Sequence, residues 1–154
     1  MPDPVCLLEP DSWMEIAKPV QEADHRLLCY FIGENQNYWD RVRAISEKTG
    51  LEPLVIPVTE GSYAQEFPLL DGADPGQFLG AMAEAEAVCT DSFHGLVFAT
   101  LFEKKTELIR RYRDDDRESK NSRVDHFQRE ICSKGLTAIR QEGLCWLEEN
   151  LNSM

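Results

Sequence analysis

The chain has 154 residues, of which 42% are hydrophobic and 29% are charged. This size and balance predict a single soluble domain that is large enough to bury a hydrophobic core. The formal net charge of -12 argues against a nucleic-acid backbone or an anionic membrane as the partner, because like charges repel. It leaves room for an anionic small molecule, since a local basic pocket can lie within an acidic surface.

The five cysteines are odd in number, and no two form a C-x-x-C pair. This pattern predicts free thiols in the reducing cytoplasm rather than a disulfide framework. The three histidines are far apart in the sequence, so we expect neither a metal site nor another cofactor. No apolar run reaches the roughly 18 residues that span a membrane, and the start has no signal-peptide core. Pro2 and Pro4 favour extended backbone there, as expected of a piece of a longer protein.

Residues 1–20 are predicted to be a linker with one short helix through Trp13 and Ile16, capped by Asp11 or Ser12. Beyond it, short and continuously apolar runs alternate with amphipathic segments. The apolar runs predict strands that are buried on both faces, as in a parallel sheet. These strands are expected at residues 26–32, 54–57, 87–90 and around 108–109.

Helices are predicted between these strands and after the last one, because apolar residues recur there at helical spacing. They are expected at 37–49, from Pro75 with Asp74 as its cap, at 93–102, from Ser122 and at 141–151. The stretches 58–72 and 110–121 are predicted loops. The residues expected to face inward include Leu144, Leu147 and Leu151, with Tyr38, Trp39, Phe78 and Trp146 in the core. The alternation predicts βαβ units and a doubly wound parallel sheet.

The segment from Val88 to Phe98 carries the most chemical information, since it reads as a strand end, a tight turn and a helix start. Ligands of open α/β sheets bind at the carboxyl ends of strands, where the first N–H groups of a helix favour anions. His94 lies beside those groups, and Gly95 lets a ligand approach the backbone. The alternative is structural: Asp91 or Ser92 caps the helix, Gly95 allows packing and His94 fills a polar gap.

The run Thr90-Asp91-Ser92-Phe93-His94-Gly95, followed by an apolar helix, resembles the most recognisable motif of the polysaccharide pyruvyl transferase family. Further likenesses follow the family's order, at Asp3-Pro4-Val5-Cys6-Leu7-Leu8, Tyr30-Phe31-Ile32-Gly33, Asp74-Pro75-Gly76-Gln77-Phe78-Leu79 and Asn121-Ser122-Arg123-Val124. One departure is Lys104-Lys105-Thr106-Glu107, where the family usually has Lys-Pro before the next strand. The likeness spans nearly all of this chain, but only the later half of a family member.

The resemblance implies a fold like that of two-domain GT-B glycosyltransferases, in which two Rossmann-like halves face a cleft. Residues 1–154 would form the carboxyl-terminal, donor-binding half, with the amino-terminal half absent. It also implies transfer of pyruvate from phosphoenolpyruvate to a pair of sugar hydroxyls as a ketal, in cytoplasmic exopolysaccharide synthesis. The partners would be phosphoenolpyruvate, a saccharide acceptor and the missing half, and this half alone is expected to be inactive.

The resemblance gives His94 the role of general acid or donor contact, which suits an imidazole because it exchanges protons near neutral pH. Ser92 and Gly95, in the same motif, are expected to contact the donor. Asp91 is a candidate base or helix cap.

Arginines near the predicted fourth strand suit bidentate phosphate or carboxylate binding. Arg110 and Arg111 follow that strand, and Arg123 lies in the Asn-Ser-Arg match. For Arg110 and Arg111 the alternative is a solvated charge run.

Two rival interpretations stay open beside the enzyme half. The first is a non-catalytic small-anion or sugar-binding domain that kept the Rossmann-like fold. The intact His94-Gly95 pair favours the enzyme over it. The second is a flavodoxin-like receiver, against which the absence of an acidic cluster after the first predicted strand counts.

Overall fold

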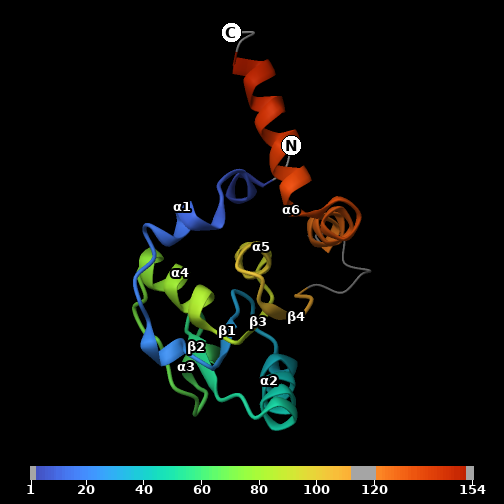
Figure 1. Cartoon of the computed structure of the whole chain (residues 1–154). Coiled ribbons are helices and arrows are strands. Elements are labelled where there is room, and N and C mark those ends of the chain that lie inside the picture. Colours follow the sequence, from blue (N-terminus) through green and yellow to red (C-terminus); the bar gives the residue numbers. More distant parts are fainter. Residues whose placement is uncertain (1–2, 112–120, 152–154) are drawn as a thin grey trace.

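A computed structural model describes residues 3–111 and 121–151 of the chain. Its centre is a four-stranded, all-parallel sheet in the order β2-β1-β3-β4 (Figure 1). The strands are β1 (Leu27–Tyr30), β2 (Pro53–Ile56), β3 (Ala87–Thr90) and β4 (Lys105–Leu108). The first strand, β1, lies inside the sheet, with β2 on one side of it and β3 and then β4 on the other. This order confirms the predicted doubly wound α/β fold.

Helices cover both faces of the sheet (Figure 1). Those that bridge the strands are α2 (Gln36–Thr49), α4 (Pro75–Glu84) and α5 (Phe93–Leu101). Leu28 of β1 packs with residues of α4 and α5, whereas its neighbour Cys29 packs with residues of α2. Successive side chains of a strand point to opposite faces, so a continuously apolar strand fits this three-layer arrangement.

The helix ends follow the local signals in the sequence. The capping box of α4 pairs the Asp74 side chain with Gln77, and Pro75 occupies the first turn. At the end of α2, Gly50 adopts the left-handed conformation with φ 74°. The cap of α5 is Ser92, whose hydroxyl accepts from the Gly95 N–H.

Strand β4 begins earlier than predicted, at Lys105 rather than near Leu108. Its residues are only partly buried or exposed, because it forms an edge of the sheet. An edge strand needs no continuous apolar run, and its polar start therefore resembled a loop in the sequence.

The amino-terminal segment crosses the α4–α5 face as η1 (Pro4–Leu7), α1 (Pro10–Met14) and η2 (Gln21–Ala23). For α1 we predicted a helix through Trp13 and Ile16 with Asp11 or Ser12 as its cap, and this was wrong at both ends. Pro10 starts it, no side chain caps it, and it stops at Met14 before Ile16. A further short helix, α3 (Glu60–Tyr63), lies inside the predicted loop 58–72 because Thr59 caps its first turn.

The carboxyl-terminal element is α6 (Asn121–Leu151), which is broken at Gly135 with φ 78° and ψ 164°. Two helices were predicted here, but the second follows directly after Gly135 rather than starting near 141. It packs on η1 through Ile139 and Arg140 and then projects from the body (Figure 1).

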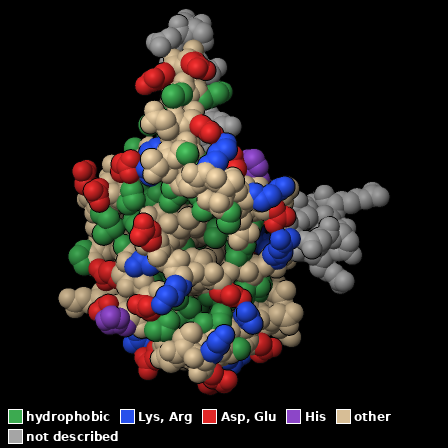
Figure 2. Space-filling view, turned by 45° about the vertical axis from the view of Figure 1, so that its right-hand side comes forward, with side chains coloured by type: hydrophobic (Ala, Val, Ile, Leu, Met, Phe, Trp, Pro, Cys, Tyr) green, Lys and Arg blue, Asp and Glu red, His purple; other side chains and the backbone are tan. Residues whose placement is uncertain are grey.

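The inward orientation predicted for the last helix is wrong in this projecting part. Leu144 is 38% exposed and Trp146, expected in the core, is 45% exposed. The side chain of Leu151 lies outside the described residues. In Figure 2 the projecting end carries hydrophobic side chains beside acidic ones. The helical spacing of these residues was correct, but spacing alone does not reveal whether a neighbour covers the face.

All five cysteines are free thiols: Cys6, Cys29 and Cys89 are buried, and Cys132 and Cys145 are exposed. Within residues 3–111 and 121–151, no helix is both long enough and apolar enough to cross a membrane.

Candidate functional site

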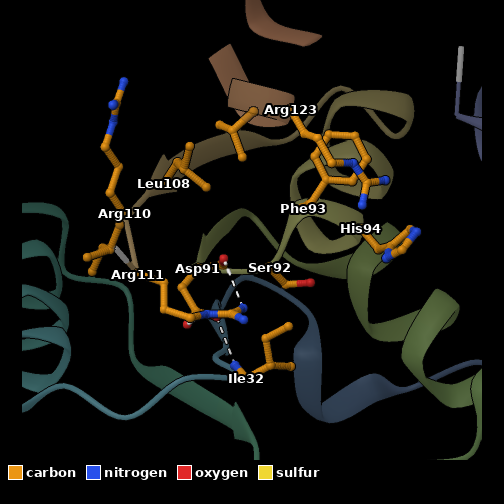
Figure 3. Close-up of a pocket in the computed structure, with 11 residues that line it drawn as sticks. Ile32, Asp91, Ser92, Phe93, His94, Leu108, Arg110, Arg111 and Arg123 are labelled. Carbon is orange, nitrogen blue, oxygen red and sulfur yellow. Dashed lines mark hydrogen bonds and ion pairs between the residues drawn. The ribbon is translucent and has the colours of Figure 1, made fainter. Parts of the chain in front are cut away.

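A pocket of about 170 Å³ lies at the carboxyl edge of the sheet, where β1, β3 and β4 end (Figure 3). Residues that follow β1 and β3, the end of β4, the first turn of α5 and the start of α6 contribute to it. Its lining comprises Ile32, Asp91, Ser92, Phe93, His94, Leu108, Ile109, Arg110, Arg111, Arg123 and Val124. The pocket lining thus includes every predicted site residue except Gly95, which follows His94 in α5.

Asp91 forms the polar floor of this region, with a side chain that is fully buried. Its Oδ1 accepts from the Ile32 N–H at 2.8 Å, and its Oδ2 accepts from the Gly33 N–H at 2.9 Å. The Tyr38 hydroxyl and the Arg111 Nε also donate to Oδ2, each at 2.9 Å. A carboxylate with four donors and a cationic neighbour is well stabilised in the interior.

This network bears on the two roles considered for Asp91, helix cap and general base. The helix cap is Ser92, so Asp91 does not cap α5. Both carboxylate oxygens are occupied by the turn after β1, by α2 and by Arg111. We therefore assign Asp91 to holding that turn, since a general base needs an oxygen that reaches the substrate.

The side chain of Thr90 links the end of β1 to the residue that caps α5. Its hydroxyl donates to the Tyr30 carbonyl at 2.6 Å and accepts from the Ser92 N–H at 3.0 Å. A Cβ on Gly95 would lie 2.6 Å from that hydroxyl oxygen. The absence of a side chain at Gly95 therefore makes room for Thr90, as the packing alternative expects, and the predicted donor contact of Gly95 stays a prediction.

Two tyrosines beside Asp91 are held in their protonated form. Burial, and then the charge of Asp91, raises the pKa of Tyr38 well above its usual range. The pKa of Tyr30 is raised for the same two reasons. Tyr38 thus acts as a hydrogen-bond donor to Asp91 at any physiological pH.

His94 lies in the first turn of α5 with 59% of its side chain exposed. Its ring contacts the Phe93 ring edge-on, with 5.7 Å between centroids. Its Nε2 lies 3.6 Å from the Oδ2 of Asp3, a residue for which we predicted no chemical role. The imidazole is thus at the sheet edge and open to solvent, not packed in the core.

The three predicted arginines differ in their surroundings. Arg111 folds onto Asp91, with a second hydrogen bond from its Nη2 to the Asp91 carbonyl at 3.3 Å. Arg110 points the opposite way in Figure 3 and pairs with Asp125 of α6 at 2.7 Å. The guanidinium of Arg123 lies 4.5 Å from the centroid of the Phe93 ring.

His94 and Arg110 lie at opposite ends of the pocket lining, whereas Arg123 lies toward the His94 end (Figure 3). A ligand that touches the imidazole therefore meets Arg123 more readily than Arg110. The sequence did not show this asymmetry: Arg110 and Arg111 were predicted at the rim of the site after the fourth strand, and Arg123 was a further candidate from the Asn-Ser-Arg match.

A family comparison matches residues 1–109 to the polysaccharide pyruvyl transferases. The chain belongs to the polysaccharide pyruvyl transferase family. The match includes the motif at Asp91 to Gly95 and the amino-terminal Asp3. It ends before Arg110, so the arginines of the pocket lie beyond the matched residues. Among curated proteins, none matches this pyruvyl transferase family member.

Proposed function

We propose that this chain is the donor-binding half of a polysaccharide pyruvyl transferase of GT-B type, which uses phosphoenolpyruvate. The observation that carries the proposal is the pocket at the sheet edge, which combines His94 with three arginines in a chain of net charge -12. Three arginine side chains at one pocket suit a small ligand with a phosphate and a carboxylate. Family membership supports a saccharide as the acceptor.

The chemistry asks for few groups from this half. Two sugar hydroxyls form bonds to C2 of phosphoenolpyruvate and lose their two protons, and the C2–O bond to phosphate breaks. The methylene carbon gains one proton to become a methyl group, and inorganic phosphate leaves with the other. In this proposal His94 delivers that proton or contacts the donor, and Arg123 binds an anionic group beside it. Arg111 supports the turn through Asp91, and the acceptor binds largely on the other half.

Donor binding tests the proposal directly. Calorimetry with the purified chain should detect binding of phosphoenolpyruvate, and binding of pyruvate or inorganic phosphate should be weaker because each has only one of the two anionic groups. Arg123→Gln should weaken phosphoenolpyruvate binding by roughly 10-fold or more, the usual loss for one charge-assisted contact. Arg43→Gln is the matched control, because Arg43 is an exposed residue of α2 that pairs with Asp40. Failure to bind phosphoenolpyruvate, or equal losses in both variants, would contradict the proposal.

Turnover separates the two roles of His94. In a protein that also contains the acceptor-binding half, His94→Ala should lower kcat by roughly 10² to 10⁴. His94→Asn should restore part of the donor affinity but none of the proton transfer. His25→Asn is the control, since His25 is exposed and precedes β1 at the opposite edge of the sheet. The chain alone should form no sugar pyruvate ketal by mass spectrometry.

A further inference from the structure

Asp3 is a charged residue near the pocket to which the proposed chemistry gives no role. Its side chain is only 8% exposed, and its Oδ2 lies 3.6 Å from both the His94 Nε2 and the Arg123 Nη2. The other oxygen, Oδ1, accepts from the Val5 N–H at 3.1 Å. One oxygen therefore holds the backbone of η1, and the other is shared by two basic side chains.

The pairing of Asp3 with Arg123 is looser than the pairings of the other pocket arginines. Arg111 donates to the buried Asp91 at 2.9 Å, and Arg110 donates to a carboxylate of α6 at 2.7 Å. The 3.6 Å between Asp3 and Arg123 exceeds a normal hydrogen-bond length. An incoming anion therefore gives up least when it takes over the contacts of Arg123.

We infer that Asp3 is the internal counter-ion of the donor site, which holds Arg123 and His94 in the free protein and competes with the donor's anionic group for them. This inference rests on the proposed function. A carboxylate between the two basic groups reduces their repulsion when His94 is protonated. The Phe93 ring under the Arg123 guanidinium keeps that group at the pocket when Asp3 releases it.

If Asp3 competes with the donor, removing its charge should strengthen donor binding rather than weaken it. Asp3→Asn keeps the Oδ1 acceptor for Val5 and removes the negative charge beside the two basic groups. The variant should bind phosphoenolpyruvate roughly 3- to 10-fold more tightly, the size expected for one partly exposed ion pair. A purely structural role for Asp3 predicts the opposite, because a disturbed η1 would loosen the site.

Two measurements on the 154-residue chain test this inference. The first needs no ligand: NMR signals of the His94 ring and of the Arg123 Nε–H should shift in Asp3→Asn, while the Nε–H signal of Arg43 stays in place. The second is calorimetry with phosphoenolpyruvate and with inorganic phosphate. Asp24→Asn is the matched control, because Asp24 is an exposed carboxylate 3.7 Å from the ring of His25. Thermal unfolding checks that Asp3→Asn keeps its fold.

Tighter anion binding by Asp3→Asn, with Asp24→Asn unchanged, supports the counter-ion. Unchanged or weaker binding in a folded Asp3→Asn variant overturns it, as do NMR signals of His94 and Arg123 that do not move. Binding of phosphate but not phosphoenolpyruvate, tightened in Asp3→Asn, supports the counter-ion and contradicts the proposed donor. If neither the wild type nor Asp3→Asn binds either anion, both proposals fail.

Discussion

Asp91 shows how one side chain can fix the position of a whole site. Its donors come from the turn after β1, from α2 and from the chain after β4, so it joins three separate segments at the sheet edge. The N–H groups of Ile32 and Gly33 are those that could meet an anion at the end of the first strand. Here an internal carboxylate already occupies them, so we expect the proposed donor on the α5 side.

Replacing this carboxylate should be costly. Asp91→Asn puts a neutral amide where a buried carboxylate accepts from four donors and removes the negative charge next to Arg111, so the free energy of unfolding should fall by about 3–5 kcal/mol. Urea titration measures this loss. Asp125→Asn breaks the exposed pair with Arg110 and should cost at most about 1 kcal/mol. A loss below about 1 kcal/mol for Asp91→Asn would show that the network contributes little.

The motif residues could be predicted from the sequence, but the separate role of each residue could not. Ser92 as a cap and His94 in the first turn followed from local rules that act over three or four residues. The partners of Asp91 lie 58, 53 and 20 residues away at Gly33, Tyr38 and Arg111, and no local rule connects them. Asp3 was missed for the same reason, since its neighbours His94 and Arg123 are distant in the chain.

At the scale of elements, the crossing of α4 with the amino-terminal segment depends on a glycine. A Cβ at Gly80 would overlap the carbonyl oxygen of Lys18. The Lys18 N–H also donates to the Gly76 carbonyl at 2.9 Å, so the two backbones touch over a full helical turn. The segment cannot move away from α4 without losing this contact.

Gly80→Ala should therefore destabilise the protein by about 1–3 kcal/mol, the usual range for an overpacked contact, although alanine favours helices. Gly61→Ala is the control, because the nearest atom to its new Cβ would be 3.7 Å away. Thermal unfolding should give a lower Tm for Gly80→Ala alone. A Tm for Gly80→Ala at or above that of the wild type would mean that the segment is not held against α4.

Elements were predictable where burial is complete and less so where it is partial. The apolar runs of β1, β2 and β3 are buried on both faces, and their period and length predicted them. The edge strand β4 and the projecting half of α6 each have a side that faces solvent. We therefore predicted the start of β4 too late in the chain, and we predicted that Leu144 and Trp146 face inward although they are exposed. The hydrophobic pattern reports what a residue prefers, not whether a neighbour is present.

At the scale of the whole molecule, buried thiols and phenols make stability depend on alkaline pH. Burial raises the pKa of Cys6 from 9.0 to about 11 and that of Cys89 from 9.0 to about 12. Both groups are protonated in the folded and unfolded states below pH 9, so their contribution is complete there. Above that value the unfolded chain loses these protons first, and stability falls as the pH rises toward 11 and 12.

The Tm should accordingly decrease between pH 9 and pH 11, steeply compared with its change between pH 7 and pH 8.5. Cys6→Ala should reduce the slope, because alanine has no proton to lose. Cys132→Ala is the control, since that thiol is exposed on α6. An equal slope in Cys6→Ala and the wild type would assign the alkaline loss to other groups.

The contact of Asp3 with Arg123 joins two residues that are far apart in the chain, so it also bears on the order in which contacts form during synthesis. The strands of the sheet lie between Leu27 and Leu108, and they can pair once that stretch has emerged from the ribosome. Asp3 contacts Arg123 at the start of α6, and the Cys6 carbonyl accepts from Arg140 at 3.1 Å further along the same helix, so both contacts need residues made after the sheet. A chain that stops between Leu108 and Arg123 would therefore contain the strands of the sheet but only part of the pocket lining.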